Sequence, residues 1–435
     1  MTKQFHIYSD PNRIAETVEA LAGMTEPNRP FTRLVFSPEF QQARQWLRSK
    51  FEEAGLHCHI DTGGSLIGTR KASATSASPG RVIIGSHIDT VPAGGRFDGI
   101  AGVVAGLEAI HFLNERQIDL PFDLEIIDFL GEELNVWGTS CLGSRHMAGL
   151  LTEDMLNRVD QDGRRLGDEI QRIGGAGTPA SGPRPDAQSI LACLELHIEQ
   201  SSRLETDQID IGIVTDIPGI SRYAIAVTGS AGHSGTTRME DRKDALVTAS
   251  DIIIATRDIA RSIAAQDNRH FVATIGRIDV YPNGAATVPG EVKMVLDLRA
   301  SHEHSRDMFL EQLQSASAHV SQRESCAIEI ERVSAARVAY MDDSLRERLT
   351  RSADHLGLSH INLSSGAGHD MAHMSRIAPA AMIFIPCRDG LSHCPEEFTT
   401  PEAIARGSAV LIHSLLDLAG LDLAGLDLAG LDLAD

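Results

Sequence analysis

A short β-branched run that ends in a glycine-rich loop constrains the fold of this chain more than any other segment. Arg81-Val-Ile-Ile84 predicts a strand over 81–86, and the loop after it carries His87, Asp89 and Asp98. In open α/β sheets, ligands bind at the carboxyl ends of the strands. We therefore predict that His87 and Asp98, eleven residues apart, are two ligands of a metal site.

The rest of the chain alternates between strand and helix on both sides of a region with a different pattern. The 435 residues exceed what one ordinary core holds, which predicts two domains. Strands are predicted at 124–129, 190–196 and 380–385, and helices within 11–55 and at 100–114, 344–356 and 401–418. This order is typical of an α/β fold class.

Near residue 215 the pattern changes to a β-α-β-β-α-β order, which is typical of a small α+β sandwich. Its predicted elements are a strand at 223–227, a helix at 243–264, strands at 271–280 and 291–298, a helix at 304–321 and a strand at 327–332. We therefore expect a catalytic domain made of residues 1–214 and 333–435, with a second domain inserted at 215–332.

The charge balance argues against two classes of partner. Lys and Arg total 39 against 60 Asp and Glu, and the formal charge of −21 repels nucleic acid and anionic membrane surfaces. We find no pattern of a secretory signal and no apolar run of about eighteen residues or more. The six scattered cysteines form no C-x-x-C pair, which favours reduced thiols. We therefore expect a cytoplasmic protein.

The last twenty residues, 416–435, repeat the unit Leu-Asp-Leu-Ala-Gly. A five-residue step rotates a helix by about 140°, so the leucines cannot hold one face. The repeat weakly resembles a pentapeptide β-helix, but four copies are too few for a stable one. We interpret this tail as a neutral repeat expansion.

Three more segments place metal-ligand side chains at predicted strand ends. Glu132 and Glu133 follow the strand at 124–129, His197 ends the strand at 190–196, and His393 follows the strand at 380–385. With His87 and Asp98 they could form a dinuclear centre. Mixtures of imidazole and carboxylate suit Zn²⁺ and also Mn²⁺, Co²⁺ or Ni²⁺. His369, in the glycine loop at 364–370, is an alternative to His393 as the third imidazole.

The chemistry of two-metal hydrolysis suggests a role for each carboxylate. Two cations about 3.5–4 Å apart need a bridging carboxylate and a hydroxide nucleophile between them, and Asp98 is the predicted bridge. Glu132 and Glu133 should point to opposite sides of an extended strand, so only one can readily bind metal. The other can take a proton from water and pass it to the leaving nitrogen. Asp89, two residues after His87, is expected to orient that imidazole.

The ordered motifs resemble the amidase/hydantoinase/carbamoylase family of dinuclear metallohydrolases. The resemblance extends from about residue 80 to residue 400 and rests on GSHIDTVPAGGRFDG, the pair at 132–133, LELHIEQ, GSAGHSGTTRMEDRKDAL, SSGAGHDM and GLSHCPEE. The family includes N-carbamoyl-L-amino acid hydrolases, β-ureidopropionases and allantoate amidohydrolases. The resemblance implies a metallopeptidase-like catalytic domain and an inserted ferredoxin-like domain that acts as a lid. It also implies that two copies of the chain form a homodimer through this inserted domain.

The resemblance also implies the roles of the metal-site residues. The residues that match the family's metal ligands are His87, Asp98, Glu133, His197 and His393. Asp98 would bridge two divalent ions and Glu132 would be the general base. The context Ser-His-x-Pro-x-Glu favours His393 over His369 as a ligand, so that His369 would line the substrate pocket.

Further residues are implied to bind the substrate, a small molecule with a carboxylate. His233 would stabilise the oxyanion, typically in the active site of the neighbouring subunit. Arg299 would pair with the substrate carboxylate, because a guanidinium can bind both oxygens. The other implied substrate contacts are Gln200, Asn283 and backbone groups of Gly366, Ala367 and Gly368. Without the resemblance, Arg299 is equally well explained as an exposed charge at a strand end.

We therefore predict an enzyme that hydrolyses the C–N bond of N-carbamoyl-L-amino acids. Allantoate, or an N-acyl amino acid or amide conjugate, is the alternative substrate class for the same site. The chain departs from the family pattern after Glu133, where 134–145 replaces the usual Gly-Ser-Arg-Phe. Trp137, in this departing run, could form a pocket wall or simply pack. A non-catalytic binding protein is disfavoured because Glu132 and every implied ligand are present, and an exopeptidase because of the His-Ile-Glu-Gln and Gly-Ala-Gly-His-Asp segments.

Overall fold

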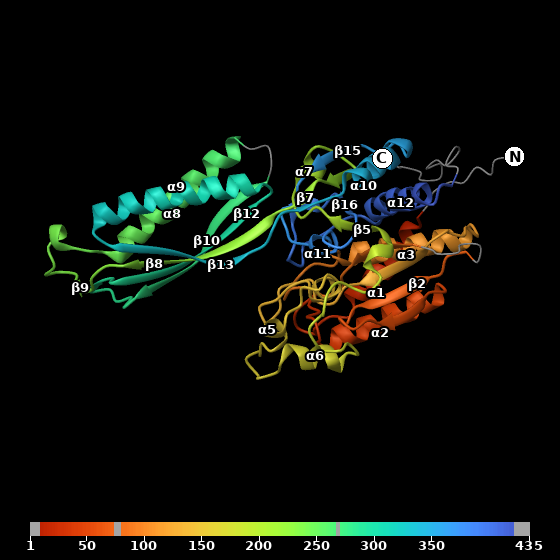
Figure 1. Cartoon of the computed structure of the whole chain (residues 1–435), viewed down its shortest axis with the longest axis horizontal. Helices are drawn as coiled ribbons and strands as arrows, with labels where there is room; N and C mark the ends of the chain where they lie inside the picture. Colours follow the sequence, from red (N-terminus) through yellow and green to blue (C-terminus); the bar gives the residue numbers. More distant parts are fainter. Residues whose placement is uncertain (1–8, 74–79, 267–269, 422–435) are drawn as a thin grey trace. The chain divides into compact units, whose positions relative to one another are not determined.

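The computed structural model describes residues 9–73, 80–266 and 270–421 (Figure 1). The chain divides into two compact units. The first contains the described residues up to Thr215, Tyr340–Leu363 and those from His369 onward, and the second contains Asp216–Ala339 and Ser364–Gly368. Among the described residues, no helix has the length and apolar character needed to cross a membrane.

The first unit is built on an eight-stranded sheet with the order β1-β2-β4-β3-β5-β16-β6-β15. Its strands are β1 (His57–Ile60), β2 (Leu66–Arg70), β3 (Arg81–Ser86), β4 (Asp123–Asp128), β5 (Ile190–Ile198), β6 (Ile211–Val214), β15 (His360–Leu363) and β16 (Ala380–Ile385). Strand β3 runs parallel to β4 and β5, and β16 runs parallel to β5. The carboxyl ends of these four strands therefore meet at one edge of the sheet, where the predicted metal ligands lie.

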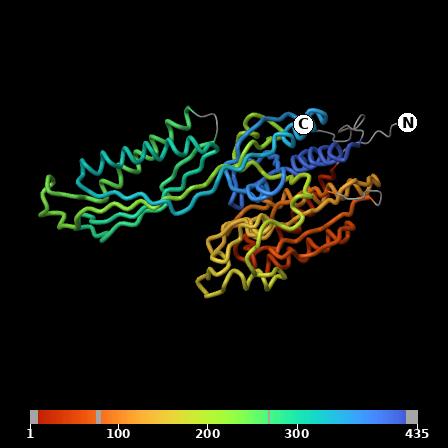
Figure 2. Tube along the Cα trace, viewed as in Figure 1, coloured from red at the N-terminus to blue at the C-terminus, as the bar shows by residue number. Residues whose placement is uncertain are grey.

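Helices pack on this sheet and bring distant parts of the chain together. The long helices are α1 (Pro11–Ala22), α2 (Pro38–Glu53), α3 (Ile100–Glu115), α10 (Asp343–His355) and α12 (Pro401–Leu418). Figure 2 shows α12, in blue, running beside α3, in orange, although they are far apart in the sequence. The structure describes the repeat at 416–435 only as far as Leu421. The interpretation of this tail as a neutral repeat expansion therefore concerns residues that lie mostly outside the described part.

Helix α3 is apolar almost all round because it is buried between the sheet and other helices. Its close approach to β5 depends on Gly102, where an added Cβ would lie 2.3 Å from the carbonyl oxygen of Leu196. Only glycine, which has no side chain, allows the two backbones to approach this closely.

The remaining elements of the first unit are short. They are α4 (Leu142–Met147), α5 (Glu153–Leu156), α6 (Leu166–Arg172), η1 (Ala187–Ser189), α7 (Arg203–Thr206), α11 (Met371–Met374) and η3 (Arg388–Gly390). The two-residue strands β7 (Asp216–Ile217) and β14 (Ala339–Tyr340) lie where the chain passes from one unit to the other.

The second unit contains the predicted β-α-β-β-α-β order. Its elements are β8 (Gly219–Thr228), α8 (Ala245–Gln266), β10 (Phe271–Tyr281), β12 (Glu291–Ala300), α9 (Glu303–Glu324) and β13 (Ala327–Ala335). The strands form an antiparallel sheet in the order β10-β12-β8-β13, and both helices cover one face of it (Figure 1). Two small strands, β9 (Gly232–His233) and β11 (Thr287–Val288), pair with each other, and η2 (Met239–Asp241) follows β9.

The second unit is larger than the segment expected at 215–332. Strand β13 continues to Ala335, and the chain stays with this unit to Ala339. The loop Ser364–Gly368 also belongs to it, because the Ser365 N–H donates to the Asp216 carbonyl and an Arg299 Nη1–H donates to the Gly366 carbonyl. Such long-range hydrogen bonds leave no local pattern in the sequence.

Arg44 joins α2 to the end of β4 from within the core of the first unit. Its guanidinium donates to Asp128 Oδ2 at 2.8 Å, to the Asp128 carbonyl at 3.0 Å and to the Gly64 carbonyl at 2.6 Å. Asp128 is completely buried and also accepts the Ile88 N–H, beside His87. This ion pair therefore supports the strand ends that carry the predicted site.

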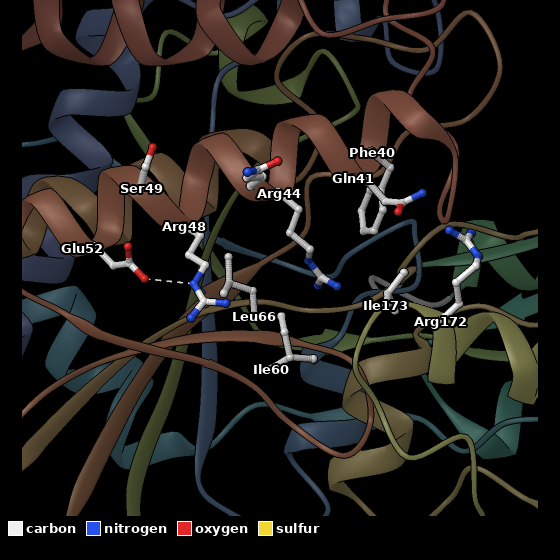
Figure 3. A pocket seen from close by; sticks show the side chains of 11 residues that line it. Phe40, Gln41, Arg44, Arg48, Ser49, Glu52, Ile60, Leu66, Arg172 and Ile173 are labelled. Carbon is white, nitrogen blue, oxygen red and sulfur yellow. Dashed lines mark hydrogen bonds and ion pairs between the residues drawn. The ribbon is translucent and has the colours of Figure 1, made fainter.

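We expect Arg44→Ala to lower the free energy of unfolding by about 3–5 kcal/mol, because it leaves the Asp128 carboxylate buried without its partner. Arg48, one turn along α2, pairs with the exposed Glu52, so Arg48→Ala should cost less than about 1 kcal/mol. Figure 3 shows both arginines at the same cavity of about 610 Å³. Urea unfolding measures the free energy of unfolding of both variants. Equal losses in Arg44→Ala and Arg48→Ala would contradict the argument that burial makes the Arg44 ion pair more important.

Candidate metal centre

Asp98 lies at the centre of the predicted ligand set, with its two oxygens facing different imidazoles. Asp98 Oδ1 is 3.0 Å from His197 Nε2 and 3.8 Å from His87 Nε2. Asp98 Oδ2 is 3.0 Å from His393 Nε2, which is itself 3.1 Å from Glu133 Oε1. The predicted ligand atoms thus form two groups that could hold a cation, and Asp98 belongs to both. A third candidate group joins His197 to Glu195 and His369.

The two buried imidazoles are held so that their Nε2 atoms face Asp98. His87 Nδ1 is 3.0 Å from the Asp89 carbonyl, and His197 Nδ1 is 2.9 Å from the Ile198 carbonyl. A carbonyl oxygen can only accept, so each Nδ1 carries its hydrogen. A ring held in this way binds a metal ion in its neutral form, through the lone pair on Nε2. A lone pair that faces a carboxylate oxygen is favourable when a cation lies between them. The donor set therefore fits divalent metal ions.

The electrostatics of the site also favour bound positive charge. Burial, followed by the charge of Glu133, raises the pKa of Glu132 well above its usual value. Burial also raises the pKa of Glu133. Burial opposes the ionisation of Asp98, but hydrogen bonds from His197 and His393 hold its pKa well below the usual range. Several carboxyl groups thus crowd a buried volume that a cation would stabilise.

Glu132 and Glu133 have different surroundings, in keeping with their predicted opposite orientations. Glu133 faces His393, whereas Glu132 Oε2 is 3.7 Å from His87 Nε2. Glu132 is 8% exposed, and its Oε1 lies 3.5 Å from the Cys141 thiol. A carboxylate that is buried beside a candidate metal ligand can exchange a proton with a reacting water.

The two-residue spacing had suggested that the Asp89 carboxylate orients His87, but the structure gives this carboxylate other partners. Its two oxygens accept the backbone N–H groups of Glu132 at 3.1 Å and Glu133 at 3.2 Å. The His87 ring is held by the backbone carbonyl of Asp89 instead, and the nearest carboxylate oxygen is 3.7 Å from Nδ1. The buried amides of the Glu pair need acceptors, and Asp89 supplies them. Asp89 therefore supports the two glutamates rather than the imidazole.

Gln200 and His369 also lie in the first unit. Gln200 Nε2–H donates to Asp98 Oδ2 and to Ser392 Oγ, both at 3.2 Å. The His369 ring is buried against His197, with ring centroids 4.6 Å apart. His393, rather than His369, is therefore the imidazole that contacts Asp98 Oδ2 and Glu133.

The other predicted substrate residues lie in the second unit, at opposite ends of its sheet. Arg299 is in register with Ile220, where β8 begins, and its guanidinium also donates to Asp297. His233 lies on β9, beyond the other end of β8, and is exposed. Asn283 is exposed in the loop before β11, the strand that pairs with β9. The eight residue-to-residue steps from Glu291 to Arg299 span about 26 Å of strand, too far for one small substrate to bridge.

Trp137, in the run that departs from the family pattern, is a packing residue. It is 5% exposed, its Nε1–H donates to the Arg164 carbonyl at 2.7 Å, and its ring meets Phe36 edge-on at 5.5 Å. The sequence had left open whether it forms a pocket wall. Sequence reasoning did not assign Glu397, a completely buried carboxylate that accepts the Asp98 N–H.

Comparison with known proteins agrees with this geometry. The model of Peptidase family M20/M25/M40 matches residues 83–417. An uncharacterized hydrolase of Haemophilus influenzae is 35% identical, covering 94% of this chain and 98% of its own. An N-carbamoyl-L-amino-acid amidohydrolase of Paenarthrobacter aurescens is 33% identical, covering 92% and 96%. The crystal structure of a hydantoinase/carbamoylase family amidase from Burkholderia multivorans is similar with a TM-score of 0.85, at 33% identity and 95% and 98% coverage. The chain is therefore a hydrolase of peptidase family M20/M25/M40 and has the fold of the hydantoinase/carbamoylase amidases.

Proposed function

We propose that this protein is a metal-dependent amidohydrolase that cleaves the C–N bond of N-carbamoyl-L-amino acids. The observation that carries the proposal is the Asp98 carboxylate, which turns one oxygen to His197 and the other to His393. The activity named for the relative from Paenarthrobacter aurescens supports the substrate class. The cytoplasm is the proposed location, since all six cysteines are unpaired.

His87 and His197 would hold one divalent ion together with Asp98, and Glu133 and His393 would hold the second. Zn²⁺, Mn²⁺, Co²⁺ and Ni²⁺ all suit this set of ligands. When bound, such ions polarise a carbonyl group and make water acidic enough to supply a nucleophile near neutral pH.

Glu132 would move the proton during the reaction. Its carboxylate accepts a proton from the attacking water, while a C–O bond forms at the carbamoyl carbon. The same group then donates this proton to the leaving nitrogen as the C–N bond breaks. The products are the free amino acid and a carbamate, which breaks down to ammonia and carbon dioxide. Asp89 would hold Glu132 in place through the backbone N–H that it accepts.

The second unit would bind the substrate carboxylate through Arg299. Its guanidinium is one-third exposed and is oriented by Asp297 and the Gly366 carbonyl. A planar guanidinium held in this way can pair with both oxygens of a carboxylate. Gly366 and Ala367 would contribute backbone contacts beside Arg299 in the second unit. Gln200 and His369 would contact the substrate at the metal centre of the first unit.

We also propose that the active protein is a homodimer in which His233 and Asn283 complete the partner's site. Support comes from the sheet of the second unit, where these residues and Arg299 lie at opposite ends. If one substrate must meet all three, two copies of the chain have to contribute.

Mixing two inactive variants tests this arrangement. Each of Glu132→Gln and His233→Ala should be nearly inactive alone. A one-to-one mixture, unfolded and refolded together, should recover about a quarter of the wild-type activity, because half of the dimers contain one intact site. Mixtures that recover no activity, although mass analysis finds mixed dimers, would contradict the shared site.

A substrate panel tests the reaction itself. Metal-stripped protein loaded with Mn²⁺, Co²⁺ or Zn²⁺ should release ammonia and the amino acid from N-carbamoyl-L-amino acids. The panel also contains allantoate and N-acetyl amino acids. Turnover of one of these without turnover of any carbamoyl compound would replace the proposed substrate class while leaving the site unchanged.

A further inference from the structure

The carboxylate of Glu397 lies between the two loops that carry Asp98 and His393. Glu397 Oε1 accepts the backbone N–H of Phe97 at 2.8 Å and that of Asp98 at 3.0 Å. Its Oε2 accepts the Ser392 hydroxyl at 2.8 Å. These contacts join segments 299 positions apart in the sequence, from Asp98 to Glu397. One side chain therefore fastens two ligand-bearing loops to each other.

The surroundings of Glu397 are shaped to hold it. At Gly95 an added Cβ would lie 1.9 Å from both Cδ and Oε1 of Glu397, so only glycine leaves room for this carboxylate. Glu397 is completely buried, and the groups that donate to its two oxygens are two backbone amides and one hydroxyl, all of them neutral. Burying a carboxylate near Asp98 without a basic partner is costly, and the three neutral donors offset only part of that cost.

The ligand that this contact steadies has a strained backbone. His393 has φ of 58°, a left-handed conformation that residues other than glycine rarely adopt. Ser392, held by Glu397, directly precedes it, and Ser392 Oγ also lies 3.4 Å from Asp98 Oδ2. The contact with Glu397 thus opposes relaxation of the His393 loop away from Asp98.

We propose that Glu397 is a positioning residue that fixes His393 relative to Asp98 and so sets the affinity for the cation held by Asp98, Glu133 and His393. This inference rests on the proposed metal centre. Removing a residue that orients the ligands of a metal site commonly weakens metal binding by about 10- to 100-fold. The His87 and His197 rings are oriented by backbone carbonyls instead and do not depend on Glu397.

Calorimetric titration of metal-stripped, full-length protein with Mn²⁺ tests the proposal. We expect two sites in the wild type. Glu397→Ala should weaken one site by about 10- to 100-fold more than the other. Gly95→Ala should do the same, because the added methyl group displaces the carboxylate. Glu397→Gln keeps an acceptor for the two amides and should stay close to the wild type. Glu396→Ala, which changes the exposed neighbour, is the matched control.

Thermal unfolding in the presence of a chelator identifies any variant that fails to fold. If Glu397→Ala or Gly95→Ala fails, the test uses Glu397→Gln and Ser392→Ala. Of these two, only Ser392→Ala should bind Mn²⁺ more weakly. Equal weakening of both sites, or Glu397→Ala with wild-type affinities, would overturn the inference. Glu397→Gln that loses as much affinity as Glu397→Ala would also overturn it, since charge rather than position would then matter. If the wild type itself binds no Mn²⁺, the proposed metal centre fails, and this inference fails with it.

Discussion

Replacing Glu132 with glutamine should reduce kcat by about 10²- to 10⁴-fold, with little change in KM or in the amount of bound Mn²⁺. The amide has nearly the same shape as the carboxylate but cannot accept the proton of the attacking water. Steady-state kinetics on an N-carbamoyl-L-amino acid, together with metal analysis of the same sample, measure all three quantities.

Two controls make this result specific to proton transfer. Glu153→Gln changes an exposed carboxylate of α5 and should have wild-type kinetics. Glu133→Gln should instead lose Mn²⁺, because Glu133 faces His393 within the second group of ligands. If Glu132→Gln loses metal while Glu133→Gln keeps it, the proposed roles of the two glutamates are exchanged.

Replacing Asp98 with asparagine should weaken the binding of both cations, by about 100-fold or more for the more affected site. Asp98 is the carboxylate shared by both ligand groups, and an amide nitrogen cannot take the place of either oxygen as a ligand. Activity should fall with the loss of metal and should recover only partly at high Mn²⁺ concentration.

Calorimetry measures this change directly, with Asp119→Asn as the control for an exposed aspartate. His197→Ala and His393→Ala complete the test, since each should weaken one site more than the other. An Asp98→Asn protein that binds only one of the two ions less tightly would mean that Asp98 belongs to one site and does not bridge.

Much of the architecture could be predicted from long, regular patterns. Strand β16 is apolar throughout and β3 contains the run Val82-Ile83-Ile84, as strands of parallel sheets do, whereas β4 and β5 combine apolar residues with a few charged ones. The order of elements in the second unit could be predicted because its two helices are each 22 residues long. Periodicity over such lengths is unambiguous.

Short elements could not be predicted in this way. Strands β1, β2, β6 and β15 were missed because each has only four or five residues, several of them His, Gly, Thr or Asn. Such segments become strands through pairing with neighbours that are already in place. The loop Ser364–Gly368 belongs to the second unit for a similar reason, since its partners lie far away in the sequence.

The sequence by itself determined the chemical inventory of the site. Its imidazoles and carboxylates follow apolar strands, and parallel strands bring such ends to one edge of a sheet. Only the tertiary structure decided which atoms meet there. It gave one oxygen of Asp98 to His197 and the other to His393, directed Asp89 to the amides of the Glu pair, and fastened two loops through Glu397. These contacts depend on strand register and backbone turns, which join residues hundreds of positions apart and leave no periodic trace in the chain.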